Sequence, residues 1–178
     1  METLTLCGRA LALLAMFVLL ALWGACLAGL RINSTHSFPI GLYWAVGRAP
    51  KKGDLVFVDP PATSIFELAR ARGYLDAGYS KSGSCALIKR LAAVPGDQVT
   101  IDFEGVCVNG THLVNSGPFD RDGAGRPLRP YLLTNYMLGP GEVLLMSEYS
   151  PLSFDARYFG PLSETTIRSA IVPIITWR

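Results

Sequence analysis

An uninterrupted apolar segment near the amino terminus is the strongest constraint on how this chain can fold. Residues 10–30 contain no charged side chain, and Arg9 and Arg31 bound them. As a helix, such a segment is long enough to cross the roughly 30 Å hydrocarbon core of a bilayer. A buried core helix is the alternative, but the short strands expected in the rest of the chain could not cover a helix on all sides. The segment is therefore predicted to be a transmembrane helix.

Two questions about this segment stay open. Small residues near its end, Gly24, Ala25 and Ala28 among them, could also form the cleavage site of a signal peptide, although an uncleaved anchor is the preferred interpretation. Basic residues near the segment are more numerous after it than before it, so charge alone weakly favours a cytoplasmic location for the domain on its carboxy-terminal side. Long domains translocate largely regardless of such charges, so this pattern does not decide the side.

The remaining residues, 31–178, are enough for one domain with its own core and too few for two. The chain carries a formal net charge of only +2 and has no basic run interleaved with aromatic residues, which argues against nucleic-acid binding. With two histidines and no CxxC pair, the chain is expected to need neither a metal nor another cofactor. Cys85 and Cys107 could form a disulfide if the domain is exported.

Short apolar runs separated by frequent Gly and Pro indicate a mainly β domain. Asn109-Gly110 is a hairpin signal, because both residues tolerate positive φ. The predicted strands are residues 42–46, 54–59, 86–92, 99–103, 106–108, 142–146 and 169–177.

One short helix is predicted from about residue 64 to residue 72. Ser64 can cap it, and Glu67 stands three residues later in a capping-box arrangement. Two segments rich in Gly, Ser, Pro and charge, 73–84 and 117–130, are predicted to be surface loops or a small cap inserted in the β core.

Ser37, shortly after the apolar segment, is the candidate nucleophile. A serine hydroxyl is a weak nucleophile at neutral pH and needs a base within hydrogen-bond reach. His36 is the chain neighbour of Ser37 and would have difficulty turning onto its Oγ, while His112 comes just after a turn and is expected to be exposed. A Ser-His-Asp triad is therefore the less favoured arrangement.

Lys89 is the better candidate for the base. Strand alternation places Leu87, Lys89 and Leu91 on one face. An amine between leucines is desolvated, which lowers its pKa from about 10.4 toward about 7 to 8, and the neutral amine can then accept the serine proton. Taken alone, Lys89-Arg90 would sooner be a solvated basic pair on an edge strand, so the surrounding sequence must decide.

Three segments, in this order along the chain, resemble the sequence boxes of type I signal peptidases. They are Ser37-Phe38-Pro39, then Lys89-Arg90-Leu91-Ala92-Ala93-Val94-Pro95-Gly96-Asp97, then Ser153-Phe154-Asp155-Ala156-Arg157-Tyr158-Phe159-Gly160. The resemblance implies a signal-peptidase-like, β-rich catalytic domain that uses a Ser/Lys dyad behind a single amino-terminal transmembrane helix. It divides the chain into a cytoplasmic tail, 1–9, an anchor in the bacterial inner membrane, 10–30, and a periplasmic serine peptidase domain, 31–178.

Carried onto the matching positions, the resemblance makes Ser37 the nucleophile and Lys89 the general base. The Ser37 backbone N–H would help to stabilise the tetrahedral oxyanion, and Thr35 stands where the family often has a second, hydroxyl donor. An ordinary threonine in an extended segment is the alternative for Thr35.

The last of the three segments would support the dyad. Ser153 matches the family serine that orients the lysine amine. Asp155 and Arg157 match a family ion pair, and the resemblance places Asp155 with Ser37 and Lys89 among the catalytic residues. Being two residues apart, Asp155 and Arg157 would lie on one side of an extended segment. A plain surface salt bridge is the alternative for this pair.

Departures from the common pattern resemble the conjugative-transfer branch, the TraF-type pilin-processing peptidases. Proline comes two residues after the nucleophile rather than three, Phe38 replaces the usual methionine, and Ser147-Glu148-Tyr149 stands where Gly-Asp-Asn is common. This branch implies a propilin substrate of a conjugative type IV secretion system, with other pilus assembly proteins as partners. It also implies removal of a short carboxy-terminal peptide through a Ser37 acyl-enzyme and head-to-tail cyclisation of the pilin. A general signal peptidase and a non-catalytic anchored assembly domain are the alternatives.

Overall fold

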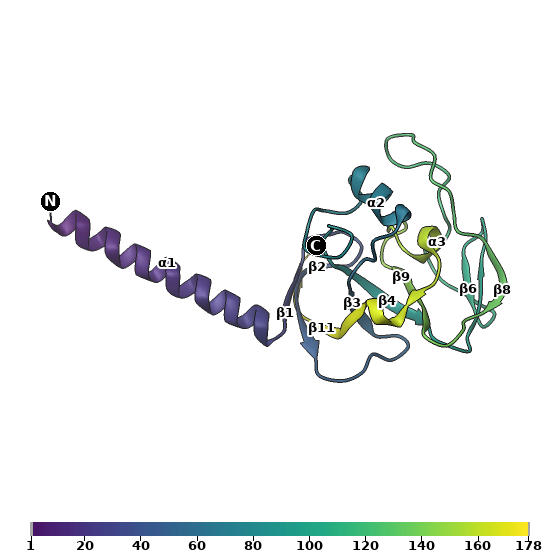
Figure 1. Cartoon of the computed structure of the whole chain (residues 1–178), viewed down its shortest axis with the longest axis horizontal. Helices are drawn as coiled ribbons and strands as arrows, with labels where there is room; N and C mark the ends of the chain where they lie inside the picture. The colour runs from purple at the N-terminus through teal and green to yellow at the C-terminus, as the bar shows by residue number, and fades with distance from the viewer. Residues whose placement is uncertain (1, 178) are drawn as a thin grey trace.

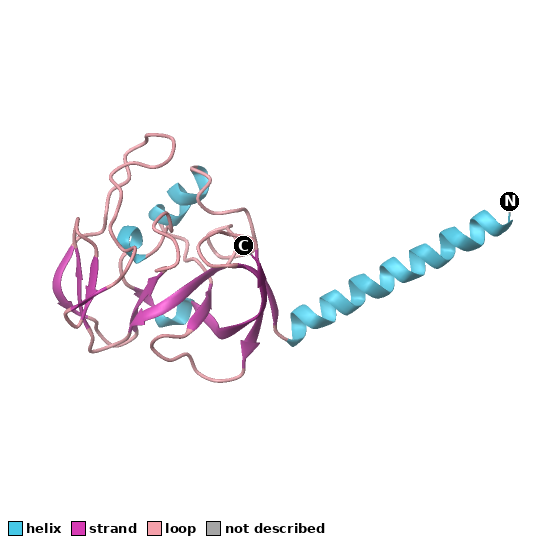
Figure 2. Cartoon of the chain, turned by 180° about the vertical axis from the view of Figure 1, so that it is seen from behind, coloured by secondary structure: helices cyan, strands magenta, loops and turns pink. Residues whose placement is uncertain are grey.

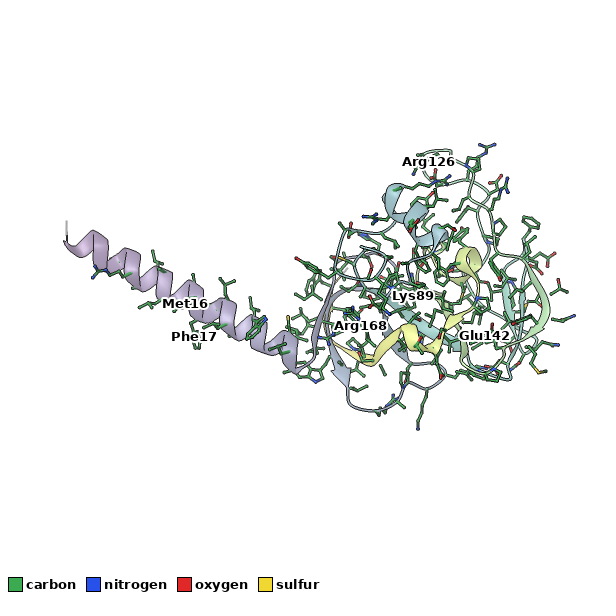
Figure 3. The ribbon with its side chains drawn as sticks, viewed as in Figure 1. Met16, Phe17, Lys89, Arg126, Glu142 and Arg168 are labelled. Atoms are coloured by element: carbon green, nitrogen blue, oxygen red, sulfur yellow. The ribbon has the colours of Figure 1, made fainter. Side chains whose placement is uncertain are left out.

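A single long helix, α1 (Glu2–Ala28), extends away from a β-rich body in the computed structural model, which describes residues 2–177 (Figure 1). Its stretch Cys7–Ala28 is long and apolar enough to cross a membrane, and its large apolar side chains are exposed rather than packed against the body. Met16 and Phe17, for example, stand free of any other element (Figure 3). The helix ends two residues before the predicted segment does, because Gly29 takes a φ of +130° and turns the chain into the first strand.

Seven antiparallel strands form the main sheet, in the order β1-β2-β11-β3-β4-β9-β10. All seven strands predicted from the sequence are present, five in this sheet and two in the smaller sheet, and their ends are shifted by at most two residues. The strands of this sheet are β1 (Leu30–Asn33), β2 (Ile40–Val46), β3 (Leu55–Val58), β4 (Leu87–Ala93), β9 (Glu142–Met146), β10 (Leu162–Ser163) and β11 (Ile167–Trp177).

A smaller antiparallel sheet, in the order β7-β6-β5-β8, lies at the end of the body far from α1 (Figure 2). Asn109 and Gly110, with φ of 49° and 77°, make the predicted turn between β6 and β7. Strand β8 was not predicted, because its side chains are mostly exposed and polar residues interrupt its apolar pattern. The strands are β5 (Gln98–Ile101), β6 (Val106–Val108), β7 (Thr111–His112) and β8 (Leu133–Met137).

Strand β4 separates two groups of buried apolar side chains. The larger group includes Leu87 and Leu91 and joins the main sheet to the small sheet and the helices. The smaller group contains Ile88 with Phe38 and Tyr43. A strand with apolar partners on both faces is a central strand, so β4 is not the edge strand that a solvated basic pair would require.

The predicted short helix is α2 (Ser64–Ala71), but its predicted cap is wrong. Thr63, with an extended backbone, occupies the N-cap position, and its side chain makes no capping hydrogen bond. The helix therefore begins at Ser64 itself, and the Glu67 N–H binds the Thr63 carbonyl. Two further helical turns, α3 (Ala156–Phe159) and the 3-10 turn η1 (Glu164–Thr166), were not predicted, since both are too short to show a helical period.

The predicted loop segments 73–84 and 117–130 are irregular, and each contains one isolated β-bridge. The disulfide between Cys85 and Cys107 is not formed, and both thiols are free. Cys85 lies just before β4 of the main sheet, whereas Cys107 belongs to β6 of the small sheet.

Candidate active site

The candidate nucleophile Ser37 lies in the turn between β1 and β2. Asn33, the last residue of β1, is buried, and its side-chain amide donates to the Phe38 and Pro39 carbonyl oxygens at 3.0 Å. One buried amide therefore holds the carbonyls of the two residues after the nucleophile. Sequence analysis missed Asn33, although a polar residue ending a strand before a turn is a signal of such a role.

The structure brings Lys89 and Ser153 to Ser37. Lys89 Nζ lies 3.2 Å from Ser37 Oγ and 2.6 Å from Ser153 Oγ, and the two hydroxyl oxygens are 3.3 Å apart. Lys89 lies in the middle of the body (Figure 3), and the residue is only 1% exposed. Three separate parts of the chain thus meet at one polar cluster, in which Lys89 and Ser153 are buried and Ser37 is half-buried.

The surroundings of Lys89 favour its neutral form. Burial lowers the pKa of the amine to about 8, the Asp155 carboxylate opposes this shift, and the Arg157 guanidinium adds to it. A fraction of the amine is therefore neutral near pH 7, and its lone pair can accept the Ser37 hydroxyl proton.

Asp155 and Arg157 form a fully buried ion pair rather than a surface salt bridge. Arg157 Nε lies 2.8 Å from Asp155 Oδ1, and both side chains are 0% exposed. The expectation of an extended segment is wrong, because Asp155 is the N-cap of α3 and its side chain accepts a hydrogen bond from the Arg157 N–H. The guanidinium also donates to the carbonyls of Gly117, Ser147 and Pro151.

Ser147 connects this ion pair to the nucleophile. Its backbone N–H donates to Asp155 Oδ2 at 3.0 Å, and its hydroxyl donates to the Ser37 carbonyl oxygen. Ser147 is fully buried, yet in the sequence it was noticed only as a departure from the common signal-peptidase pattern. Among the residues described, the Asp155 side chain bonds Ser147 and Arg157 but not the dyad, so its place is that of a positioning residue.

The side chains of Thr35, His36 and His112 make no hydrogen bond to Ser37 Oγ among the described residues. The Thr35 hydroxyl donates to Asn33 Oδ1 at 2.9 Å, so binding an oxyanion would require it to change partner. His36 is exposed on the wall of the cavity, and the His112 ring lies at the Glu104 carbonyl in the small sheet. In the described part of the chain, only Lys89 and Ser153 side chains hydrogen-bond Ser37 Oγ.

A cavity of about 660 Å³ opens in front of the cluster. Its walls come from the nucleophile turn, from the beginning of the 73–84 loop, from residues 85–89 at the start of β4, from the 117–130 loop and from the segment before α3. This volume is within the roughly 300–1,000 Å³ that is typical of ligand-binding clefts. Within residues 2–177 no three His, Cys, Asp or Glu side chains form a group that could hold a metal ion.

Comparison with known proteins gives one family and several relatives. The family model for signal peptidase, peptidase S26, matches residues 4–177. A plasmid transfer protein TraF of Escherichia coli is 45% identical over 154 residues, 86% of each chain. A probable conjugal transfer protein TraF of Sinorhizobium fredii is 39% identical, over 94% of this chain and 88% of its own.

Among solved structures, a signal peptidase I from Enterococcus faecalis is similar over 69% of this chain and 97% of its own, with 16% identity and a TM-score of 0.40. A conjugal transfer protein TraF of Agrobacterium tumefaciens is 37% identical over 92% of each chain.

Proposed function

The chain belongs to the peptidase S26 family of signal peptidases, and from that membership we propose a serine endopeptidase in which Ser37 and Lys89 form the catalytic dyad. The observation that carries this proposal is a buried amine with a lowered pKa, 3.2 Å from a serine hydroxyl at the wall of a large cavity. A nucleophile and a base within hydrogen-bond reach are the minimum that acyl transfer requires.

In the first half-reaction, Ser37 Oγ attacks the scissile carbonyl carbon, and its proton passes to Lys89 Nζ. The tetrahedral oxyanion is stabilised by the Ser37 backbone N–H and by Thr35, once that hydroxyl leaves Asn33. When the C–N bond breaks, Lys89 returns the proton to the leaving amine, and an ester to Ser37 remains. Ser153, 2.6 Å from Nζ, keeps the amine aimed at the reacting atoms throughout.

Similarity to plasmid and conjugal transfer proteins supports a propilin of a conjugative type IV secretion system as the substrate. In the second half-reaction, the pilin's own amino group attacks the ester, Lys89 accepts the amine proton, and Ser37 Oγ takes a proton as it leaves. The product is a head-to-tail cyclic pilin. Aminolysis outruns hydrolysis when the tethered amine has a high effective concentration at the ester.

We place the catalytic domain on the periplasmic side of the bacterial inner membrane, with α1 as an uncleaved anchor. The apolar stretch of α1 leads almost directly into β1, and β1 ends at the nucleophile turn. The active site would therefore lie close to the membrane in which a small pilin precursor resides.

The pKa of Lys89 predicts how the rate of acylation depends on pH. Because the neutral amine is the base, the rate should rise as the pH rises through about 8. Between pH 7 and pH 9 the neutral fraction, and the rate with it, should increase about tenfold. Single-turnover acylation measured across this range checks the expectation. Activity that appears only above about pH 9 would contradict a desolvated Lys89.

The intact mass of a candidate propilin, after incubation with membranes carrying this protein, tests the proposed function. We expect a product that requires Ser37 and is lighter than the linear cleaved pilin by one water. A Ser37-dependent linear product, together with cleavage of unrelated preproteins, would instead identify a general signal peptidase. Pilus assembly that survives in the Ser37→Ala variant would identify a non-catalytic assembly domain.

A further inference from the structure

The loop that joins β7 to β8 carries a projecting flap, residues 117–130, which forms part of the cavity wall. The flap is the long loop at the top of Figure 1, and Arg126 lies near its tip in Figure 3. A bridge between Arg121 and Pro127 narrows it into a hairpin-like shape. Arg121 and Asp122 both line the cavity.

The flap is tied to the segment just after α2. Asp122 accepts a hydrogen bond from the Tyr74 hydroxyl and one from Arg126 Nε, the latter at 2.6 Å. The Arg126 guanidinium also lies over the Tyr74 ring, 5.7 Å from its centroid. At the base of the flap, the Phe119 N–H donates to the Tyr158 hydroxyl at 3.0 Å. These contacts hold the flap as a fixed wall of the cavity.

Among the residues described, the Arg121 guanidinium on this wall is available to a ligand. Asp122 is occupied by Tyr74 and Arg126, and the Tyr74 hydroxyl holds the pKa of Asp122 well below its usual range. Arg121 has no carboxylate partner among the residues described, and its side chain donates there only to the Gly125 carbonyl, at 3.0 Å, which leaves most of its N–H groups free. Asp76, also at the cavity, lies in the segment after α2 and makes no ion pair with Arg121.

We propose that Arg121 binds the carboxy-terminal carboxylate of the substrate and thereby selects a short leaving peptide; this inference rests on the proposed function. Ser37 and Arg121 line the same cavity, so a peptide of a few residues can occupy both. A guanidinium binds a carboxylate through two parallel N–H···O bonds, which fixes orientation as well as charge. A preprotein that continues for many residues past its cleavage site presents no carboxylate there, so Arg121 favours cleavage close to a chain terminus.

Binding of synthetic peptides to the full-length Ser37→Ala protein tests this inference without requiring turnover. The peptides copy the propilin carboxy terminus across the cleavage site and end either in a free acid or in an amide. We expect the free acid to bind about fivefold to tenfold more tightly than the amide, since only the acid gives the exposed Arg121 guanidinium a charged partner. In the Arg121→Gln variant the two peptides should bind equally, and the amide should bind as it does to the parent protein.

Arg129→Gln is the matched control, because Arg129 is an exposed arginine of the same flap that does not line the cavity. It should keep the preference for the free acid. The proposal is overturned if the parent protein binds both peptides equally, if Arg121→Gln keeps the preference, or if that variant weakens both peptides alike. Propilin processing by the unmutated protein reports separately on the proposed function. If the unmutated protein forms a Ser37-dependent product but the peptides show no preference for the free acid, only the role of Arg121 is refuted. If neither processing nor peptide binding is observed, the role of Arg121 and the proposed function are both refuted.

Discussion

Processing of the propilin should fall at least about a thousandfold when Ser37 is replaced by alanine or Lys89 by methionine. The first change removes the attacking oxygen, and the second removes the base while keeping an unbranched side chain of similar size. Methionine suits the site because Lys89 is 1% exposed and lies between the apolar side chains of β4. Rates of product formation, measured by mass spectrometry with purified proteins, give the comparison.

Lys52→Gln is a suitable control for these variants. Lys52 is exposed and forms an ion pair with Asp97 at 2.9 Å, away from the cavity-lining residues. This variant should keep the rate of the unmutated protein. If Lys89→Met retained substantial processing while it folded normally, Lys89 would not be the base, and a different proton acceptor would have to be sought.

Replacing Arg157 by methionine should lower the free energy of unfolding by about 3 to 5 kcal/mol. The change leaves the Asp155 carboxylate charged, unpaired and fully buried, and it removes the donor of three backbone carbonyls. Chemical denaturation of the detergent-solubilised protein, monitored by tryptophan fluorescence, measures the difference. Activity should fall as well, since Asp155 holds Ser147, and Ser147 binds the Ser37 carbonyl.

Arg168→Met provides the matched comparison for stability. Arg168 forms a 2.8 Å ion pair with Asp59, but its side chain is 48% exposed. An exposed pair contributes at most about 1 kcal/mol, so this variant should unfold close to the unmutated protein. If Arg157→Met and Arg168→Met lowered the free energy of unfolding equally, burial of the Asp155–Arg157 pair would have little energetic consequence.

Local sequence signals were sufficient to predict those helices and strands whose structure depends on neighbouring residues along the chain. One uncharged run predicts the apolar helix, and short apolar segments between Gly and Pro predict the seven strands. Signals of this kind failed at the start of one helix and for one exposed strand. The helix α2 begins with Thr63 rather than Ser64 as its cap, and β8 was missed altogether because its residues show no clear alternation.

The identity of the candidate dyad was also accessible from the sequence, through the motifs around Ser37, Lys89 and Ser153. Their separation in the chain, 52 residues from Ser37 to Lys89 and 116 from Ser37 to Ser153, gives no distance in space. Motif order can suggest that such residues meet, but it cannot say which backbone groups hold them.

The sequence by itself determined the long apolar helical segment, the mainly β character and the residue types of the candidate site. Only the tertiary structure decided that β4 is a central strand, that Lys89 is thereby buried, and that Asn33 and Ser147 hold the nucleophile turn. The physical reason is that burial and hydrogen-bond partners depend on which strands pair. That pairing is settled by contacts between segments far apart in the chain, which no local pattern encodes.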